Sequence, residues 1–171
     1  MTAPDGIMGI TPCRLREILD YSPLTGAVHN RRTKRLLQAD HDGLVTVFCS
    51  KQKKPHKLKL DKIAFALAHG VFPRKDRRVL HRNLDTSDNS LKNLAVVSRG
   101  VFLLIKEAYK NLAGGIKINA HHTDQFCYVV SWTEQNKDKS KVVHDIVEAR
   151  RVVAALSLHY SKVLTKYCVF D

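Results

Sequence analysis

The sequence lacks the patterns that mark several common classes of protein. Its four cysteines are scattered and form no C-x-x-C pair, so they do not supply the paired ligands of a zinc site or the framework of a small disulfide-rich protein. We expect buried, reduced thiols at Cys13, Cys49, Cys127 and Cys168. The longest apolar run, Val101–Ile105, is far too short to span a bilayer. The N-terminal "MTAPDGIMGITP" has no signal-peptide pattern, and we therefore expect a cytoplasmic protein.

Acidic residues are scarce relative to basic ones. The 171 residues include 29 Lys and Arg but only 16 Asp and Glu, a formal net charge of +13. A surface of this kind attracts polyanions, because each neutralised phosphate releases condensed counterions. A basic amphipathic helix typical of membrane-surface proteins is absent from the sequence. The expected partner is therefore duplex DNA or structured nucleic acid rather than a membrane.

Local signals predict an α+β chain, and its 171 residues are enough to bury a hydrophobic core. Thr11 and Pro12 begin a helix with Leu15, Ile18 and Leu19 on one face. A short β-meander is expected over 27–60, with strands in "GLVTVFC" and after the basic turn "KQKK". A helix follows, with Asp61 as its cap and Gly70 as its end.

The middle of the chain alternates apolar and polar segments. Val79 and Leu80 form a strand that leads into His81, and a polar loop follows to Ser87. Leu91, Leu94 and Val97 predict a helix that starts at Asp88 or Asn89, and "RGVFLLIKEAYKNL" predicts another. Gly114-Gly115 is the clearest hinge. We place the boundary there, between modules 1–113 and 114–171.

The second module reads as three strands and one helix. "GIKINA", "FCYVVSW" and "KSKVVH" are the strand candidates. Asp145 and Glu148 form a capping box at the start of "DIVEARRVVAALSLHYSKV", in which apolar residues recur at helical spacing. These elements predict a small α+β module.

The residues around His81 have the composition of a one-metal nuclease site. A neutral imidazole at the end of a strand can deprotonate water, and a side-chain amide can fix its tautomer. Hard oxygen ligands would hold the divalent cation against the scissile phosphate.

This pattern resembles the phage HNH homing endonucleases. The family's N-terminal helix and "TG" turn, its "HRLAW" helix and its "DHxxG…DNR…NLR…N" core are matched in order by "LREILDYSPLTG", "DKIAFALAHGVFP" and "LHRNLDTSDNSLKNL". The resemblance covers residues 13–111 and implies a ββα-metal core over 77–111. It implies that His81 is the general base and that Asn93 orients it, with Asp88-Asn89 starting the metal-site helix.

The same resemblance shows where the metal ligands are missing. The aspartate that the family has before the histidine is Leu80, its second protein ligand is Phe102, and the histidine of the "HRLAW" helix is Asp61. Leucine and phenylalanine have no lone pairs for Mg²⁺. Asp85 or Asp88 is the substitute that the sequence offers, although a turn or cap is the ordinary role of such an aspartate. Without its ligands, His81 is expected to be a hydrogen-bonded structural residue.

Residues 114–170 are similar to the DNA-binding domain of plant ethylene-response factors, which homing endonucleases of this kind often carry. The similarity implies a sheet that enters the major groove. Alternation places the side chains of Lys117, Asn119 and His121 on one face. Trp132 is either a contact residue or part of the core.

Basic residues complete the set of candidate contacts. Lys137, Lys139 and Lys141 lie near the predicted second turn, and other cations fall in "NRRTKR" and around "RKDRR". The expected nucleic-acid contacts of the first module are Arg31, Arg32, Lys34, Arg35, Arg74, Lys75, Arg77, Arg78 and Arg82.

The sequence favours a nucleic-acid-binding protein that derives from an HNH endonuclease and does not cleave. No cofactor is then expected. One alternative is an active nicking endonuclease that uses Mg²⁺ or Mn²⁺. The other is a phage interaction protein that engages or inhibits a host protein of nucleic-acid metabolism, in the host cytoplasm. The sequence leaves the oligomeric state open.

Overall fold

The computed structural model describes residues 10–48, 55–122 and 126–168. These residues form four α-helices and several small antiparallel sheets, a mixed α+β architecture. They separate into two compact units, and the division lies between Arg99 and Gly100. This division comes earlier in the chain than the hinge predicted at Gly114-Gly115. None of the described helices combines the length and the apolar character that crossing a membrane requires.

The first unit is built from paired strands and two helices. Its described strands pair as β1 with β2, β3 with β4 and β5 with β6, all antiparallel. The single meander expected over 27–60 is therefore wrong, because β2 pairs with β1 instead of joining β3. In chain order the elements are α1 (Pro12–Ile18), β1 (Leu19–Tyr21), β2 (Val28–Asn30), β3 (Leu44–Phe48), β4 (Pro55–Lys59), α2 (Leu60–His69), β5 (Arg77–His81) and β6 (Leu94–Ser98).

Local signals set the ends of α1 and α2. The Thr11 side chain accepts a hydrogen bond from the backbone N–H of Arg14, which confirms the predicted cap. Gly70 ends α2 in the left-handed conformation, with φ of 77°, as predicted. The cap predicted at Asp61 is wrong. Lys59 holds the cap position, and Asp61 lies in the first turn, where its carboxylate accepts the N–H of Lys62.

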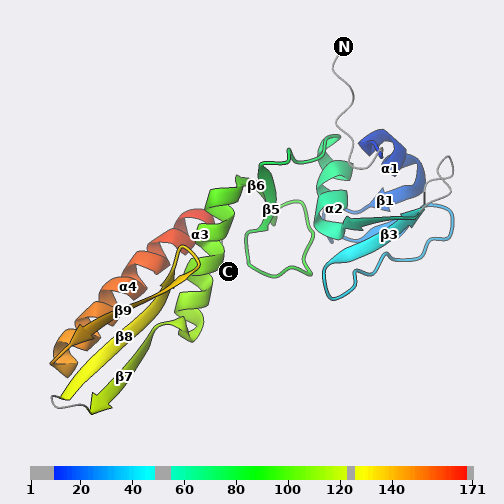
Figure 1. Ribbon diagram of the computed structural model, residues 1–171. Coiled ribbons are helices and arrows are strands. Elements are labelled where there is room, and N and C mark those ends of the chain that lie inside the picture. The colour runs from blue at the N-terminus through cyan, green and yellow to red at the C-terminus, as the bar shows by residue number, and fades with distance from the viewer. Residues whose placement is uncertain (1–9, 49–54, 123–125, 169–171) are drawn as a thin grey trace. The chain divides into compact units, whose positions relative to one another are not determined.

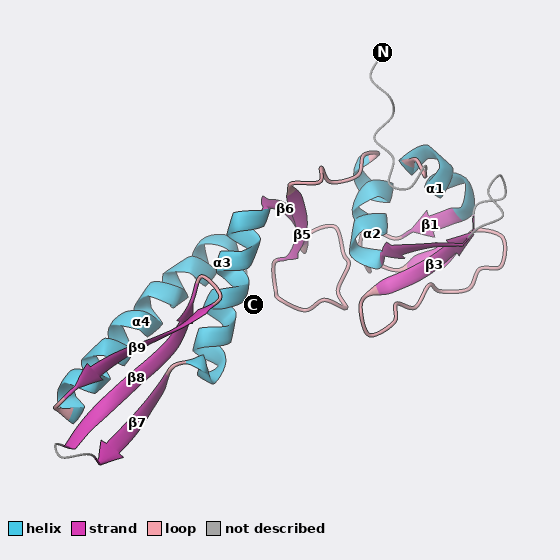
Figure 2. Cartoon of the chain, viewed as in Figure 1, coloured by secondary structure: helices cyan, strands magenta, loops and turns pink. Residues whose placement is uncertain are grey.

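The segment after His81 differs most from expectation. No helix forms between Asp88 and Val97; a polar loop covers 82–93 and the strand β6 follows (Figure 2). Asparagine and aspartate side chains in the loop accept backbone N–H groups, which competes with helix formation. The apolar residues after the loop pair with β5 instead, in the register His81↔Leu94.

The core of the first unit lies between the two helices and the hairpins. It contains Leu15, Val28, Val45 and Ile63, among other buried residues. The Arg16 guanidinium donates to the carbonyl oxygen of Leu67 at 3.0 Å, which joins α1 to the last turn of α2. Leu19 and Val28 place the β1–β2 hairpin in this core. Tyr21 of the same hairpin donates a hydrogen bond to Asn89, in the loop after His81.

The second unit is a three-stranded sheet with helices. Its elements are α3 (Arg99–Lys110, from Gly100 onward in this unit), the turn η1 (Asn111–Gly115), β7 (Lys117–His122), β8 (Phe126–Glu134), β9 (Lys137–Val143) and α4 (Ile146–Tyr167). The sheet order is β7-β8-β9, and α4 runs along one face of it (Figure 1). The Asp145 side chain accepts the N–H groups of Val147 and Glu148, which confirms the Asp145 half of the predicted capping box. The Glu148 carboxylate lies 3.3 Å from Nζ of Lys141 instead.

Two further details concern the β8–β9 turn and the cysteines. The turn between β8 and β9 needs only Gln135 and Asn136, both with positive φ, although it contains no glycine. Three cysteines lie in the described residues and all are free. Cys168 is buried, and burial raises the pKa of its thiol. Cys13 is exposed, so the expectation that every thiol is buried is wrong.

Candidate functional site

The β5–β6 hairpin places His81 at the end of a strand. His81 is 8% exposed and follows Val79 and Leu80, which are both buried. Since Val79 packs in the main core and side chains alternate along a strand, His81 points to the same side as Val79. The imidazole is therefore held at the edge of the core instead of on an open surface.

The amide that meets the His81 ring is that of Asn89. The Nε2 atom of His81 lies 3.2 Å from Oδ1 of Asn89, whose Nδ2 donates to the carbonyl oxygen of Ser87. An amide oxygen only accepts hydrogen bonds, so this pattern assigns the ring proton to Nε2. The Nδ1 atom of His81 has no hydrogen-bond partner among the described residues.

Asn93, the residue that the resemblance assigns to orienting His81, has a different set of contacts. Its Oδ1 accepts the backbone N–H of Asn83 at 2.9 Å, and its Nδ2 donates to the carbonyl oxygen of Asp88 at 2.7 Å. The buried Asn93 side chain thus joins two parts of the 82–93 loop. Asn93 braces the loop, and Asn89 faces the ring.

The two aspartates of the loop are engaged in its turns. Hydrogen bonds from the Ser87 side chain and backbone hold the pKa of Asp85 below its ordinary value. Ser90, whose backbone N–H donates to one Asp88 oxygen, does the same for the pKa of Asp88; the second oxygen accepts the side-chain amide of Asn83. Both carboxylates are thus ionised at neutral pH, and each stabilises a local turn.

The sequence did not indicate the residues that contact the backbone around Asn89 and hold it in place. The Tyr21 hydroxyl donates to the carbonyl oxygen of Asn89 at 2.9 Å, and the N–H of Leu91 donates to the carbonyl oxygen of Pro23 at 2.8 Å. Gly26 lies against the same backbone. The "YSPLTG" stretch predicted a turn, but no local signal linked that turn to the His81 loop.

The residues that the structure describes around His81 do not fit a divalent cation held by the protein. Leu80 is 4% exposed and supplies no lone pair. Phe102 lies in α3, in the other unit, and the Asp61 carboxylate accepts a backbone N–H within α2. In the described part of the chain, no three His, Cys, Asp or Glu side chains form a group that could hold a metal ion.

The first basic patch is the turn after β2. We use this name for Arg31, Arg32, Lys34 and Arg35, all of which are exposed. Asp20 partly neutralises the patch, because its carboxylate lies 2.8 Å from Nε of Arg31 and 3.4 Å from Nζ of Lys34. These contacts, led by the Arg31 hydrogen bond, hold the pKa of Asp20 below its ordinary value.

The second basic patch leads into β5. We use this name for Arg74, Lys75, Arg77 and Arg78, of which all but the half-buried Arg78 are exposed. The Arg78 guanidinium donates to the carbonyl oxygens of Lys75 and Arg77, which fixes it across the turn. Arg82 is exposed beyond the other end of β5, at the start of the loop. The Lys51–Lys54 group lies outside the described residues.

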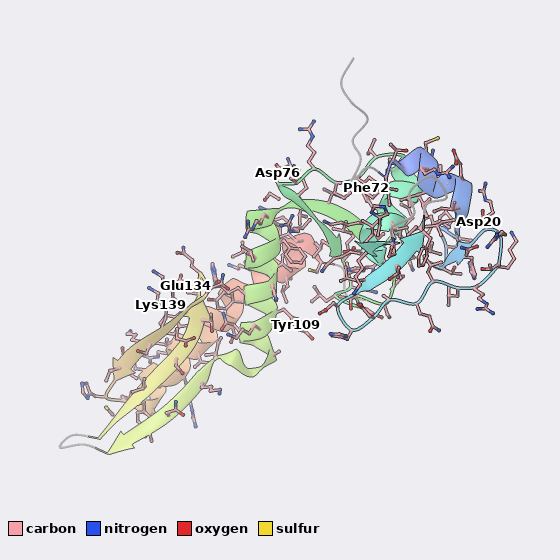
Figure 3. All side chains as sticks on the ribbon, turned by 45° about the vertical axis from the view of Figure 1, so that its right-hand side comes forward. Asp20, Phe72, Asp76, Tyr109, Glu134 and Lys139 are labelled. Atoms are coloured by element: carbon pink, nitrogen blue, oxygen red, sulfur yellow. The ribbon has the colours of Figure 1, made fainter. Side chains whose placement is uncertain are left out.

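The two basic patches lie at opposite ends of the first unit. Figure 3 labels Asp20, which contacts the first patch, and Asp76, which lies 3.6 Å from the Arg77 guanidinium of the second. The two aspartates appear at opposite ends of the unit. One phosphate group therefore cannot contact both patches, and a nucleic acid that meets both must run along the unit.

The candidate contacts of the second unit divide between the two faces of its sheet. Lys117 pairs with Ser131 and Asn119 pairs with Val129 across the β7–β8 ladder, so these side chains share one face. The opposite face carries Val130, which packs against α4. Lys117 and Asn119 therefore lie on the open face. His121 belongs to β7, but its side chain lies outside the described part.

The other candidates lie on the face toward α4. Trp132 packs against the core formed with α4, which favours the core alternative for this residue. The β9 lysines pair across the ladder with β8 residues of this face, such as Val130 and Trp132. Lys141 also forms an ion pair with Glu148 of α4 at 3.3 Å. They do not form one surface with Lys117. The lysines concerned are Lys137, Lys139 and Lys141.

No protein-family model, curated protein or solved structure matches this chain.

Proposed function

We propose that this chain binds duplex DNA or structured nucleic acid through its basic patches and does not cleave it. One observation carries the proposal: the cations on both sides of β5 are exposed, whereas the residue before His81 is the buried Leu80, whose side chain has no atom that can bind a metal ion. A protein derived from an HNH homing endonuclease would keep phosphate contacts in this way after losing its metal ligands. The open face of the sheet, with Lys117 and Asn119, offers a second contact surface.

The experiment is a titration of a short fluorescent duplex with the full chain at several salt concentrations. Phosphate contacts predict a steep negative slope of log binding constant against log salt, about 0.9 per contact on duplex DNA. Replacing the four cations of the first or the second basic patch with glutamine should reduce that slope.

A control replaces Lys137, Lys139 and Lys141 with glutamine, because these exposed lysines belong to neither patch and lie on the sheet face toward α4. It should leave the slope closer to the wild-type value than either patch variant does. A shallow wild-type slope would contradict the proposal and favour a protein partner, such as a host protein of nucleic-acid metabolism.

The second candidate is a nicking endonuclease, and the free Nδ1 atom of His81 favours it. An imidazole whose Nε2–H is held by an amide can take a proton from water at Nδ1. Incubation of supercoiled plasmid with the chain and Mg²⁺ or Mn²⁺ separates the candidates. Nicking that disappears in His81→Ala would replace our proposal; intact plasmid beside tight, salt-sensitive binding supports it.

A further inference from the structure

The β1–β2 turn, by which we mean residues 21–27 with Tyr21 at the end of β1, contacts the segment that carries Asn89 at three points. The Tyr21 hydroxyl donates to the Asn89 carbonyl oxygen at 2.9 Å, and the Pro23 carbonyl oxygen accepts the N–H of Leu91 at 2.8 Å. Gly26 provides the third contact. The backbone on both sides of Ser90 is therefore held by one short turn of the N-terminal part of the chain.

Gly26 permits this contact because it has no side chain. Its φ is +74°, a conformation that L side chains rarely adopt. A Cβ atom at this position would lie 2.4 Å from the carbonyl carbon of Asn89 and 2.4 Å from the nitrogen of Ser90. The loop backbone thus lies directly on the turn, and a larger residue would displace it.

Tyr21 supplies the polar part of the same contact. Burial, followed by the negative charge of Asp88, raises the pKa of the Tyr21 phenol. The hydroxyl therefore keeps its proton at neutral pH and remains a donor to the carbonyl of Asn89. With the backbone fixed on both sides and a side chain 4% exposed, Asn89 is restricted to the conformation that faces His81.

We propose that the β1–β2 turn is a positioning element for His81, acting through Asn89. The turn fixes the Asn89 amide, the Oδ1 atom of Asn89 holds the proton on Nε2 of His81, and Nδ1 is left as the acceptor for a water or another proton donor. Asn89, Tyr21 and Gly26 are positioning residues. This assignment does not require that the chain bind nucleic acid.

The test observes the Nε2–H proton of His81 directly, by NMR of the full chain labelled with ¹⁵N-histidine. His81→Gln identifies the signal. A buried, hydrogen-bonded Nε2–H should give a visible, slowly exchanging resonance. Asn89→Leu has a similar size but no acceptor, so the resonance should disappear into exchange with water. Asn89→Asp keeps an acceptor oxygen and should retain it.

Tyr21→Phe tests the turn itself. Loss of one hydrogen bond of about 1 kcal/mol predicts roughly fivefold faster exchange of the His81 proton. Tyr109→Phe is the matched control, because this exposed tyrosine of α3 has no part in the contact. Gly26→Ala should act in the same direction and more strongly, with circular dichroism to report folding.

Three results would overturn the proposal. The first is a wild-type ring protonated on Nδ1. The second is an Asn89→Leu variant whose Nε2–H signal is unchanged. The third is a Tyr21→Phe variant in which the Nε2–H proton of His81 exchanges at the wild-type rate, although Asn89→Leu speeds its exchange. Asn89 would then be positioned without the turn. Failure of nucleic-acid binding would leave each of these readouts as it is.

Discussion

Asn111 and Thr133 are joined by two hydrogen bonds that connect the turn η1, which follows α3 directly, to the sheet of the second unit. The side-chain nitrogen of Asn111 donates to the carbonyl oxygen of Thr133 at 2.7 Å, and the N–H of Thr133 donates to Oδ1 of Asn111 at 3.1 Å. The Tyr160 hydroxyl of α4 donates to the same carbonyl. This network explains why most of α3 belongs to the second unit, although a glycine pair follows it.

Removing the Asn111 amide should destabilise the second unit. Asn111 is 1% exposed, so Asn111→Leu would leave the N–H of Thr133 buried without an acceptor. We expect a loss of about 1–3 kcal/mol in the free energy of unfolding, measured with urea. The control Asn119→Leu, at an exposed position of the open sheet face, should change it by about 0.5 kcal/mol or less. Equal losses would contradict this account.

The elements that the sequence predicted correctly are those with local signals. Thr11, Gly70 and Asp145 act on backbone groups a few residues away, so their roles can be read from the adjacent sequence. The strand β6 could not be read in this way. Leu91, Leu94 and Val97 have helical spacing, and the pairing of β6 with β5 that overrides it is a nonlocal contact.

Asp20 should weaken nucleic-acid binding by pairing with the first basic patch. Its carboxylate contacts Arg31 and Lys34. Asp20→Asn frees both cations for phosphates, so we expect a few-fold tighter binding of duplex DNA at low salt and a steeper salt dependence. The control is Glu17→Gln, which changes the net charge equally but removes only a contact with Arg14. An equal gain in both variants would show that net charge alone is responsible.

The sequence indicated which residues make up the candidate site but not which of them contacts the His81 ring. The spacing of histidine and asparagines marked His81, Asn89 and Asn93, yet the resemblance assigned the orienting amide to Asn93. Which amide faces the ring depends on the path of the loop. Tyr21 fixes that path through a hydrogen bond across 68 positions of sequence. A contact of this range leaves no periodic signal in the residues near His81.

Placing a carboxylate beside His81 should harm the fold instead of creating an enzyme. Leu80 is buried in β5 opposite Ala95. Leu80→Asp would bury an unpaired charge, and we expect a loss of about 3–5 kcal/mol in the free energy of unfolding, with no plasmid nicking. Leu80→Met conserves volume and should lose less than about 1.5 kcal/mol. A stable Leu80→Asp variant that nicks plasmid would contradict this prediction.

The 82–93 loop should lose its turns in acid. The N–H groups of Ser87 and Ser90 donate to Asp85 and Asp88, and the folded pKa values of both carboxyls lie below the ordinary 3.8. A depressed folded pKa means that the contribution to stability is complete above 3.8 and is lost as the pH falls through the lower folded values. The amide ¹⁵N–¹H shifts of Ser87 and Ser90 should therefore titrate together with midpoints below 3.8.

Asp88→Asn is the control for the acid titration. Its amide oxygen can still accept the N–H of Ser90 but does not titrate, so the Ser90 shift should stay nearly constant while Ser87 still responds through Asp85. Midpoints at or above 3.8 in the wild type would mean that these hydrogen bonds do not favour the ionised carboxylates. The aspartates would then be free to turn outward, and the loop would not be braced by its own side chains.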